Sequence, residues 1–376
     1  MKKDSKKPPK KEFIHSLGEK DDMLNVIKYF LGLNDISSLV SEYTTIDGKK
    51  IYSPESNKQI QNITTSTYLN LKNRHNGIYI MDVDESSIDI EKDKFKKFLV
   101  AELKKHLKSL SELFPYHDFS YIKQNYDVLT FIVRFSNVET DIAYNGFNKV
   151  NLPIIFLQLE PRNNEKDNTI KTLRHEYTHF CCNGSINKKI KNGYLKNVPR
   201  FLNEGLTQDV TNQVFNHEHF DQNVINMGLQ TYTINTQLAH IYITLFGDRT
   251  VYSSYFDQDM SLINKKFVEL VKKTGISLDN ILFPGEKNLN DFIARLNFEL
   301  EYLSNYLGQC SFSNAPKDLK FNHIDKFLDI ANTYFSFFSK DLNQMKVNMD
   351  RLFAFKENYK IMINYINQIT EDPTFK

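Results

Sequence analysis

The C-terminal part of the chain constrains the fold most strongly. No Pro or Gly occurs between residues 318 and 371, so neither of the residues that break or weaken helix interiors interrupts this stretch. Before and within it, apolar side chains recur mainly at intervals of three and four residues, which is the spacing of one helix face. The first run consists of Leu289, Ile293, Leu296, Leu300, Leu303 and Leu307. We therefore expect an α-helical C-terminal domain over residues 281–376, built as a helical hairpin or bundle.

Upstream of this domain, strand patterns and helix patterns are interspersed. Alternating or continuous apolar runs predict strands at residues 77–83, 128–133 and 153–159. Helical spacing predicts helices at residues 23–33, 90–114, 169–182 and 199–215. The expected organisation is a flexible basic tail (1–12), an N-terminal α/β region (13–125), a catalytic core (126–280) and the helical domain.

Composition excludes several functional classes. The net charge of +2 and the small share of Arg among the 48 basic residues argue against a nucleic-acid partner. No stretch reaches the ~18–20 apolar residues of a membrane span, and no apolar segment follows the Lys-rich start as a signal peptide would require. Three Cys, two of them adjacent, make a disulfide framework unexpected. We expect a cytoplasmic protein, or one exported by a route that needs no apolar signal.

The most informative motif is the pentapeptide His175-Glu176-Tyr177-Thr178-His179. Two His at i and i+4 lie on one helix face, where both imidazoles can bind the same zinc ion. Glu176 lies about 100° around the helix and can reach a metal-activated water without ligating the metal. The arrangement is HExxH, and the alternative is that both His are ordinary hydrogen-bonded helix residues.

A catalytic zinc needs a third protein ligand. The metzincin pattern fails, because Cys182 and Ser185 occupy the positions of its Gly and His. Cys181 and Cys182 are poorly placed on the same helix and are expected to be packing residues. The better candidate is Glu204, 25 residues past His179, on a second helix that can approach the metal from the side. Gly205 would let that helix come close to its neighbour.

The two segments HEYTH and PRFLNEGL together resemble the gluzincin metallopeptidases, in particular the peptidase MA-like and aminopeptidase-like branch. The resemblance covers about residues 127–275. It implies an α+β fold, in which a zincin-like core of mixed β-sheet, HExxH helix and third-ligand helix precedes the α-helical C-terminal domain. It also implies that His175, His179 and Glu204 bind one Zn²⁺ per chain and that Glu176 is the general base.

Other expectations from the resemblance are less sharply defined. A Tyr or His is expected to stabilise the oxyanion, and the candidates are Tyr255 first, then Tyr252, with His240 also possible. The Asp that orients a His ligand in some gluzincins is replaced by Gln208, with Asp209 one residue further on. The strand at 153–159 is expected either at a sheet edge, where it would pair with an extended substrate, or in the core.

We expect a zinc-dependent peptidase acting on a peptide or protein substrate. The aminopeptidase Gly-x-Met-x-Asn signature is absent before the HExxH helix, which favours an endopeptidase. One alternative is an exported effector protease with a single protein substrate. Another is a non-catalytic zinc-binding scaffold with a vestigial site, whose C-terminal helices engage a protein partner. A nucleic-acid module that uses the basic tail ranks third.

Overall fold

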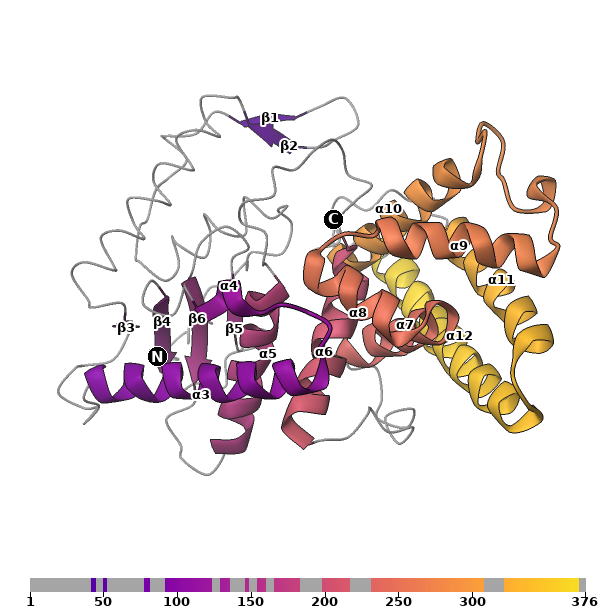
Figure 1. Ribbon diagram of the computed structural model, residues 1–376. Helices are drawn as coiled ribbons and strands as arrows, with labels where there is room; N and C mark the ends of the chain where they lie inside the picture. The colour runs from indigo at the N-terminus through magenta and orange to yellow at the C-terminus, as the bar shows by residue number, and fades with distance from the viewer. Residues whose placement is uncertain are drawn as a thin grey trace, which may run out of the picture.

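The computed structural model describes residues 42–44, 50–52, 78–81, 92–123, 129–135, 146–148, 154–159, 166–182, 198–216, 231–307 and 321–371. The basic tail and the helix expected at 23–33 lie outside these residues. Figure 1 shows strands β3 to β6 on the left, α5 and α6 in the middle, and α7 to α12 on the right.

The described strands are short. They are β1 (Glu42–Thr44), β2 (Lys50–Tyr52), β3 (Ile78–Met81), β4 (Thr130–Phe135), β5 (Gly146–Asn148) and β6 (Ile154–Leu159). The first two pair as an antiparallel ribbon. The other four form one sheet in the order β3-β4-β6-β5, in which β5 is antiparallel to β6 and the remaining pairs are parallel.

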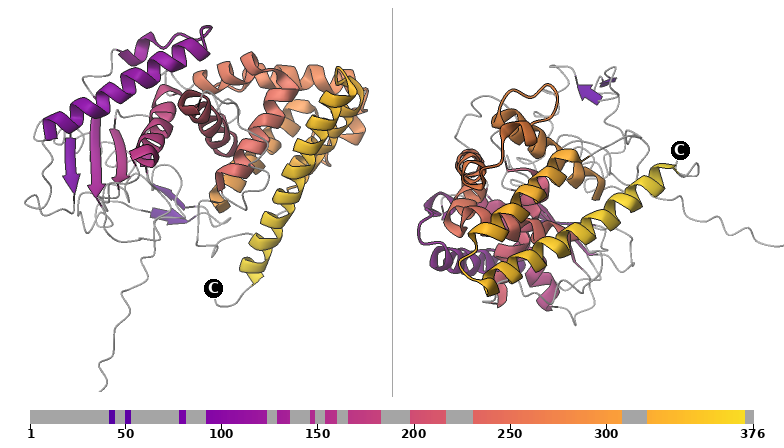
Figure 2. Two further views of the ribbon diagram at one scale, coloured as in Figure 1. Left: turned by 90° about the horizontal axis from the view of Figure 1, so that it is seen from below. Right: turned by 90° about the vertical axis from the view of Figure 1, so that its right-hand side faces the viewer.

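Helices make up most of the described chain. They are α3 (Lys92–Leu113), α4 (Ser120–Lys123), α5 (Lys166–Cys182), α6 (Arg200–Asn216), α7 (Thr231–Phe246), α8 (Asp248–Asp257), α9 (Ser261–Thr274), the 3₁₀ turn η5 (Leu278–Asn280), α10 (Leu289–Leu307), α11 (Asn322–Phe338) and α12 (Leu342–Glu371). The strands predicted near 77, 128 and 153 and the helices predicted near 90, 169 and 199 are confirmed as segments. The right-hand view of Figure 2 looks onto α11 and α12, which lie side by side as the expected hairpin.

The α+β class predicted from the sequence is wrong, because the structure supports an all-α helical class. The physical reason lies in what surrounds α6, the helix of the NEGL segment. It packs against α3, α5, α7, α8 and α10, so the core of this region is formed by helices packed on helices. The sheet of three- to six-residue strands is a small addition beside α5, and its buried apolar residues join the helical core. Buried apolar residues from β3 to α12 form one continuous core.

Strand β6 also corrects a more specific expectation. It pairs along its full length with β4 and, through Ile155 to Leu157, with β5 on its other side. It is therefore an interior strand: of the two places expected for it, the core is confirmed and the substrate-binding sheet edge is wrong. The completely buried side chains of Ile155 and Leu157 fit an interior strand with apolar surroundings. Of the described strands, β5 forms the edge on this side of the sheet.

The division of the chain into domains at residues 125 and 280 stays a prediction. Helices from the two sides of residue 280 pack together, α10 against α6 and α12 against α7. In the described residues, none of the helices combines the length and the hydropathy that a membrane span requires.

Candidate metal centre

Helix α5 presents the HExxH residues from a buried position. His175 and Glu176 are buried, and His179 is half-buried. The two imidazole rings lie 4.8 Å apart between centroids and are nearly perpendicular, at 79°. Rings this close together are expected of side chains one helical turn apart. The sequence prediction that both rings share one face of α5 is therefore confirmed.

Helix α6 brings Glu204 to the same place. Its Oε2 atom lies 3.5 Å from Nε2 of His175 and 3.3 Å from Nε2 of His179. One donor atom from each of the three residues lies within 4.8 Å of the others, so this group could hold a metal ion. Two donors bonded to one zinc ion at ~2.0–2.1 Å in tetrahedral geometry lie about 3.3–3.4 Å apart. The measured separations between Glu204 and each His fit that value.

Gly205 makes the position of α6 possible. A Cβ atom built on this residue would lie 2.1 Å from the backbone oxygen of Asn235 in α7 and 2.5 Å from its carbonyl carbon. The two helix backbones therefore approach more closely than any side chain at this position allows. The amide of Asn235 also donates to the backbone oxygen of Phe201 in α6, at 3.0 Å. The prediction that Gly205 permits a close helix neighbour is confirmed, and that neighbour is α7.

Electrostatics distinguish the two glutamates. Burial raises the pKa of Glu176 to about 8, with His175 acting to lower it and Glu204 acting to raise it further. Burial would also raise the pKa of Glu204, but the charge and hydrogen bonds of His179 and His175 outweigh it and hold that pKa well below its usual value. Glu204 is therefore an ionised carboxylate facing two imidazoles, which is the charge state of a metal ligand.

Thr207 is a residue beside the candidate ligands that the sequence analysis did not single out. Its hydroxyl lies 3.2 Å from Nδ1 of His179, on the side of the ring opposite the nitrogen that faces Glu204. Glu204 and Thr207 are three residues apart on α6, so one helix face reaches both sides of the imidazole. The segment NEGLT places the Thr207 hydroxyl one helical turn after the Glu204 carboxylate, and this spacing is the sequence feature that could have identified Thr207.

The predicted oxyanion residues Tyr255 and Tyr252 both lie in the interior. The hydroxyl of Tyr255 is 2.5 Å from that of Thr207, and the whole residue is buried. The hydroxyl of Tyr252 bonds to Oδ2 of Asp209 and accepts from Gln213 at 2.8 Å. Burial raises the pKa of both phenols well above the usual value, so both keep their protons. Both phenol hydroxyls hydrogen-bond to side chains of α6, and that of Tyr255 also bonds to the thiol of Cys182 on α5.

His240 and Gln208 also have structural partners. Nε2 of His240 lies 2.9 Å from Oδ1 of Asp209, whose other oxygen is shared by Tyr252 and Gln213. The amide of Gln208 donates to Asn212 at 3.0 Å. The acceptor that the resemblance would place at position 208 for a ligand His is thus provided by Thr207, one residue earlier.

Polar contacts also anchor α5 from behind. Thr178, inside the HExxH motif, donates to the backbone oxygen of Arg174 and contacts Nε2 of His106 at 2.9 Å and Thr211 at 3.1 Å. Burial, assisted by Arg174, lowers the pKa of His106 to about 3, so this imidazole is neutral. The hydroxyl of Tyr177 donates to the backbone oxygen of Leu99 in α3. These bonds hold α5 between α3 and α6.

The two described Cys are not part of the group. Cys181 and Cys182 are buried free thiols, and the thiol of Cys182 donates to the backbone oxygen of Thr178 at 3.0 Å. Burial raises the pKa of both thiols. Neither belongs to the cluster of metal-ligating atoms found in the described residues. Their expected role as packing residues fits this placement.

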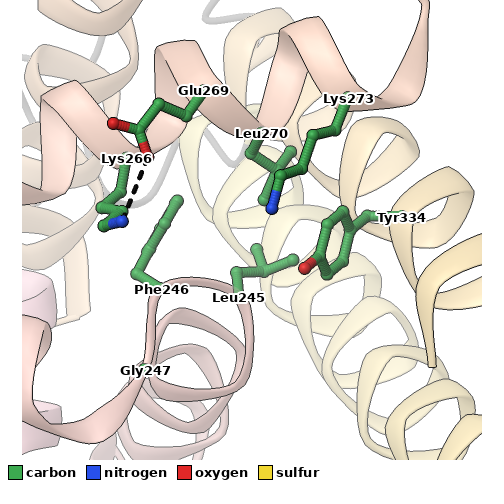
Figure 3. A pocket seen from close by; sticks show the side chains of 8 residues that line it. All are labelled: Leu245, Phe246, Gly247, Lys266, Glu269, Leu270, Lys273 and Tyr334. Carbon is green, nitrogen blue, oxygen red and sulfur yellow. Dashed lines mark hydrogen bonds and ion pairs between the residues drawn. The ribbon is translucent and has the colours of Figure 1, made fainter. Parts of the chain in front are cut away.

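A separate cavity lies among α7, α9 and α11. It has a volume of about 220 Å³ and shares no residue with the metal group. Figure 3 shows its apolar floor of Leu245, Phe246 and Leu270, with Lys273 and Tyr334 on one side. On the other side Lys266 pairs with Glu269 at 3.0 Å. The cavity has a charged rim and no side chain from α5 or α6.

Comparison with known proteins gives no relative: no family model, curated protein or solved structure matches the chain.

Proposed function

We propose that this chain is a zinc-dependent metallopeptidase of the gluzincin type that acts as an endopeptidase. One observation carries the proposal: Oε2 of Glu204 lies 3.3 and 3.5 Å from the Nε2 atoms of the two HExxH imidazoles. The three side chains come from two helices, with Glu204 25 residues after His179 in the chain, and their donor atoms all lie within 4.8 Å of one another. Ordinary helix histidines do not require such convergence.

The donor set favours zinc over other biological cations. Two imidazole nitrogens and one carboxylate are the ligands of one class of catalytic zinc site, which leaves a fourth position open. Calcium and magnesium prefer sites built from oxygen ligands. The buried polar surroundings on α3, α5 and α6 fix the ligands on helices, which is how a preorganised site is built.

Within this proposal each residue has a defined task. Bound zinc supplies Lewis acidity, which polarises a peptide carbonyl and makes water a better nucleophile near neutral pH. His175, His179 and Glu204 hold the ion. Glu176, one residue along the same helix, takes the proton of the attacking water and delivers it to the leaving amine. Its buried position keeps bulk water away from that proton transfer.

A place for an extended substrate can also be named. Strand β5, which contacts α5, forms one of the two edges of the described four-stranded sheet. Main-chain pairing with an exposed sheet edge is a common way to bind an extended peptide. We assign this role to β5 in place of the interior strand β6.

The competing proposal is a zinc-binding scaffold with a vestigial catalytic site. The presence of Glu176 favours the enzyme, because metal binding by the three ligands does not need this buried carboxyl. The two are separated with Glu176→Gln, assayed for zinc content and for cleavage of fluorescein-labelled casein and a fluorogenic peptide library. Zinc retained with cleavage lost supports the enzyme, whereas cleavage equal to wild type contradicts the role of Glu176.

A matched control for that experiment is Glu299→Gln. Glu299 is a partly buried glutamate on α10 that bonds to His323, so the substitution makes the same chemical change within a different helix pair. It is expected to retain both zinc and cleavage. A wild-type protein that binds zinc and cleaves none of the probes, under conditions where a known metallopeptidase cleaves them, favours the scaffold.

A further inference from the structure

The hydroxyl of Thr207 is the meeting point of four polar groups. It lies 3.2 Å from Nδ1 of His179, 2.5 Å from the hydroxyl of Tyr255, and 2.9 and 3.4 Å from the backbone and side-chain oxygens of Asn203, both of which can only accept. Thr207 and Tyr255 are completely buried. The contact therefore joins α5, α6 and α8 in an interior where an unmatched donor or acceptor is costly.

The protons in this cluster can be assigned by donor and acceptor chemistry. The backbone oxygen of Asn203 only accepts, so it takes the single proton of the Thr207 hydroxyl. Both lone pairs of that hydroxyl are then available to accept. The hydroxyl of Tyr255 donates to one, and Nδ1–H of His179 donates to the other.

This assignment determines the tautomer of the ligand. With Nδ1 occupied by its proton, Nε2 is the nitrogen of His179 left to bind a metal ion. It lies 3.3 Å from Glu204, and the proton that it shares with this carboxylate is the one that a metal ion would replace. An imidazole binds a metal ion through the lone pair of a ring nitrogen. We infer that Thr207 is a positioning residue that holds His179 in the metal-binding tautomer and orientation, and that Tyr255 acts through Thr207.

This inference rests on the proposed metal function and assigns Tyr255 a different place in it. Tyr255 was expected at the oxyanion, but its hydroxyl is used in donating to Thr207. It helps commit the Thr207 hydroxyl to accepting from His179. The helix that provides the third ligand thus also orients the second one, from a position three residues further on.

The test is the zinc dissociation constant of the full-length protein, measured by competition with a chromophoric chelator. Thr207→Val keeps the shape and removes the hydroxyl, and it is expected to weaken zinc binding about 10- to 100-fold. Thr207→Ser restores the hydroxyl and is expected to bind close to wild type. Tyr255→Phe leaves the His179–Thr207 bond in place and is expected to weaken binding by less than Thr207→Val.

The matched control is Thr244→Val. Thr244 is a half-buried threonine on α7 that donates to the backbone oxygen four residues earlier, as Thr207 does, and it contacts none of the three candidate ligands. It is expected to leave the zinc constant unchanged, and unfolding in urea shows whether each variant remains folded. Thr207→Ser as weak as Thr207→Val would mean that the methyl group or the packing matters and would overturn the inference.

The remaining outcomes are equally decisive. Wild-type affinity in Thr207→Val would overturn the inference while leaving the metal site intact. Wild-type affinity in Tyr255→Phe would remove Tyr255 from the chain of hydrogen bonds. A wild-type protein that binds no zinc would overturn the proposed function itself, which makes the two failures distinguishable.

Discussion

Gly205→Ala tests how the third ligand is delivered to the site. In a helix interior this substitution ordinarily stabilises a protein, because Ala favours the helix by about 1 kcal/mol relative to Gly. Here the added Cβ would lie 2.1 Å from the backbone oxygen of Asn235. Ordinary contact begins near 3.4 Å, so α6 and α7 have to separate by about 1.3 Å at this point.

The expected effect is therefore opposite in sign to helix propensity. Overpacking of a filled core costs typically about 1–3 kcal/mol and occasionally more. Backbone atoms form the obstacle, so no side-chain rotation relieves it. Subtracting the favourable propensity of about 1 kcal/mol leaves about 0–2 kcal/mol, and because backbone atoms form the obstacle we expect a net loss near the upper end, about 2 kcal/mol, in the free energy of unfolding. Because Gly205 follows Glu204 directly, the same displacement moves the carboxylate and weakens zinc binding.

The assay combines urea unfolding with zinc titration. Gly275→Ala is the control: Gly275 ends α9 with φ +67 in open space, so Ala there is strained without a clash. It is expected to cost about 1 kcal/mol of stability and to leave the zinc constant unchanged. If Gly205→Ala is as stable as wild type and binds zinc equally well, the close approach of α6 and α7 does not position Glu204.

Three further predictions concern stability. Asp209→Asn is expected to cost about 1.5–3 kcal/mol at pH 7, since it weakens bonds to a buried carboxylate. Burial would raise the pKa of Asp209, but the bonds from His240, Tyr252 and Gln213 lower it below its usual value. The stabilisation is therefore present above the unfolded pKa of about 3.9 and is lost as the pH falls through the folded pKa. A wild-type-minus-variant difference that shrinks between pH 8 and 6 would contradict this. Phe292→Ala, at a completely buried ring, is expected to cost about 3–5 kcal/mol in urea unfolding; a loss below 1 kcal/mol would show that the helical core is looser than described. Free zinc at 100 times its dissociation constant is expected to raise the unfolding free energy by about 2.7 kcal/mol, an increment that chelation removes and that a metal-free fold would not show.

The sequence predicted local structure well, and it named the three residues whose side chains the structure brings together as a group that could hold a metal ion. The 4-3 apolar spacing of α10 and the run without Pro or Gly in α11 and α12 identify those helices, because helix formation depends on local periodicity. The HExxH spacing places two imidazoles together for the same reason. Glu204 was found through its neighbours in the NEGL segment, and the structure brings it to both His.

What the sequence did not predict depends on contacts between distant segments. The fold class was inferred from strand patterns and a motif resemblance, whereas the surroundings of α6 are helical. The interior place of β6 depends on its pairing with the three residues of β5, which carry almost no pattern. The contact from Tyr255 through Thr207 to His179 joins three helices. The NEGLT spacing places Thr207 one turn after Glu204, but it does not specify that this hydroxyl meets His179 and Tyr255.

The most direct test of the metal centre is the zinc content of purified wild-type protein beside Glu204→Ala, determined by mass spectrometry without chelators in the buffers. The account predicts about one zinc ion per wild-type chain and a much reduced content in the variant, in which the carboxylate ligand is missing. Wild-type protein without zinc, or equal zinc in both proteins, would contradict the three-ligand centre.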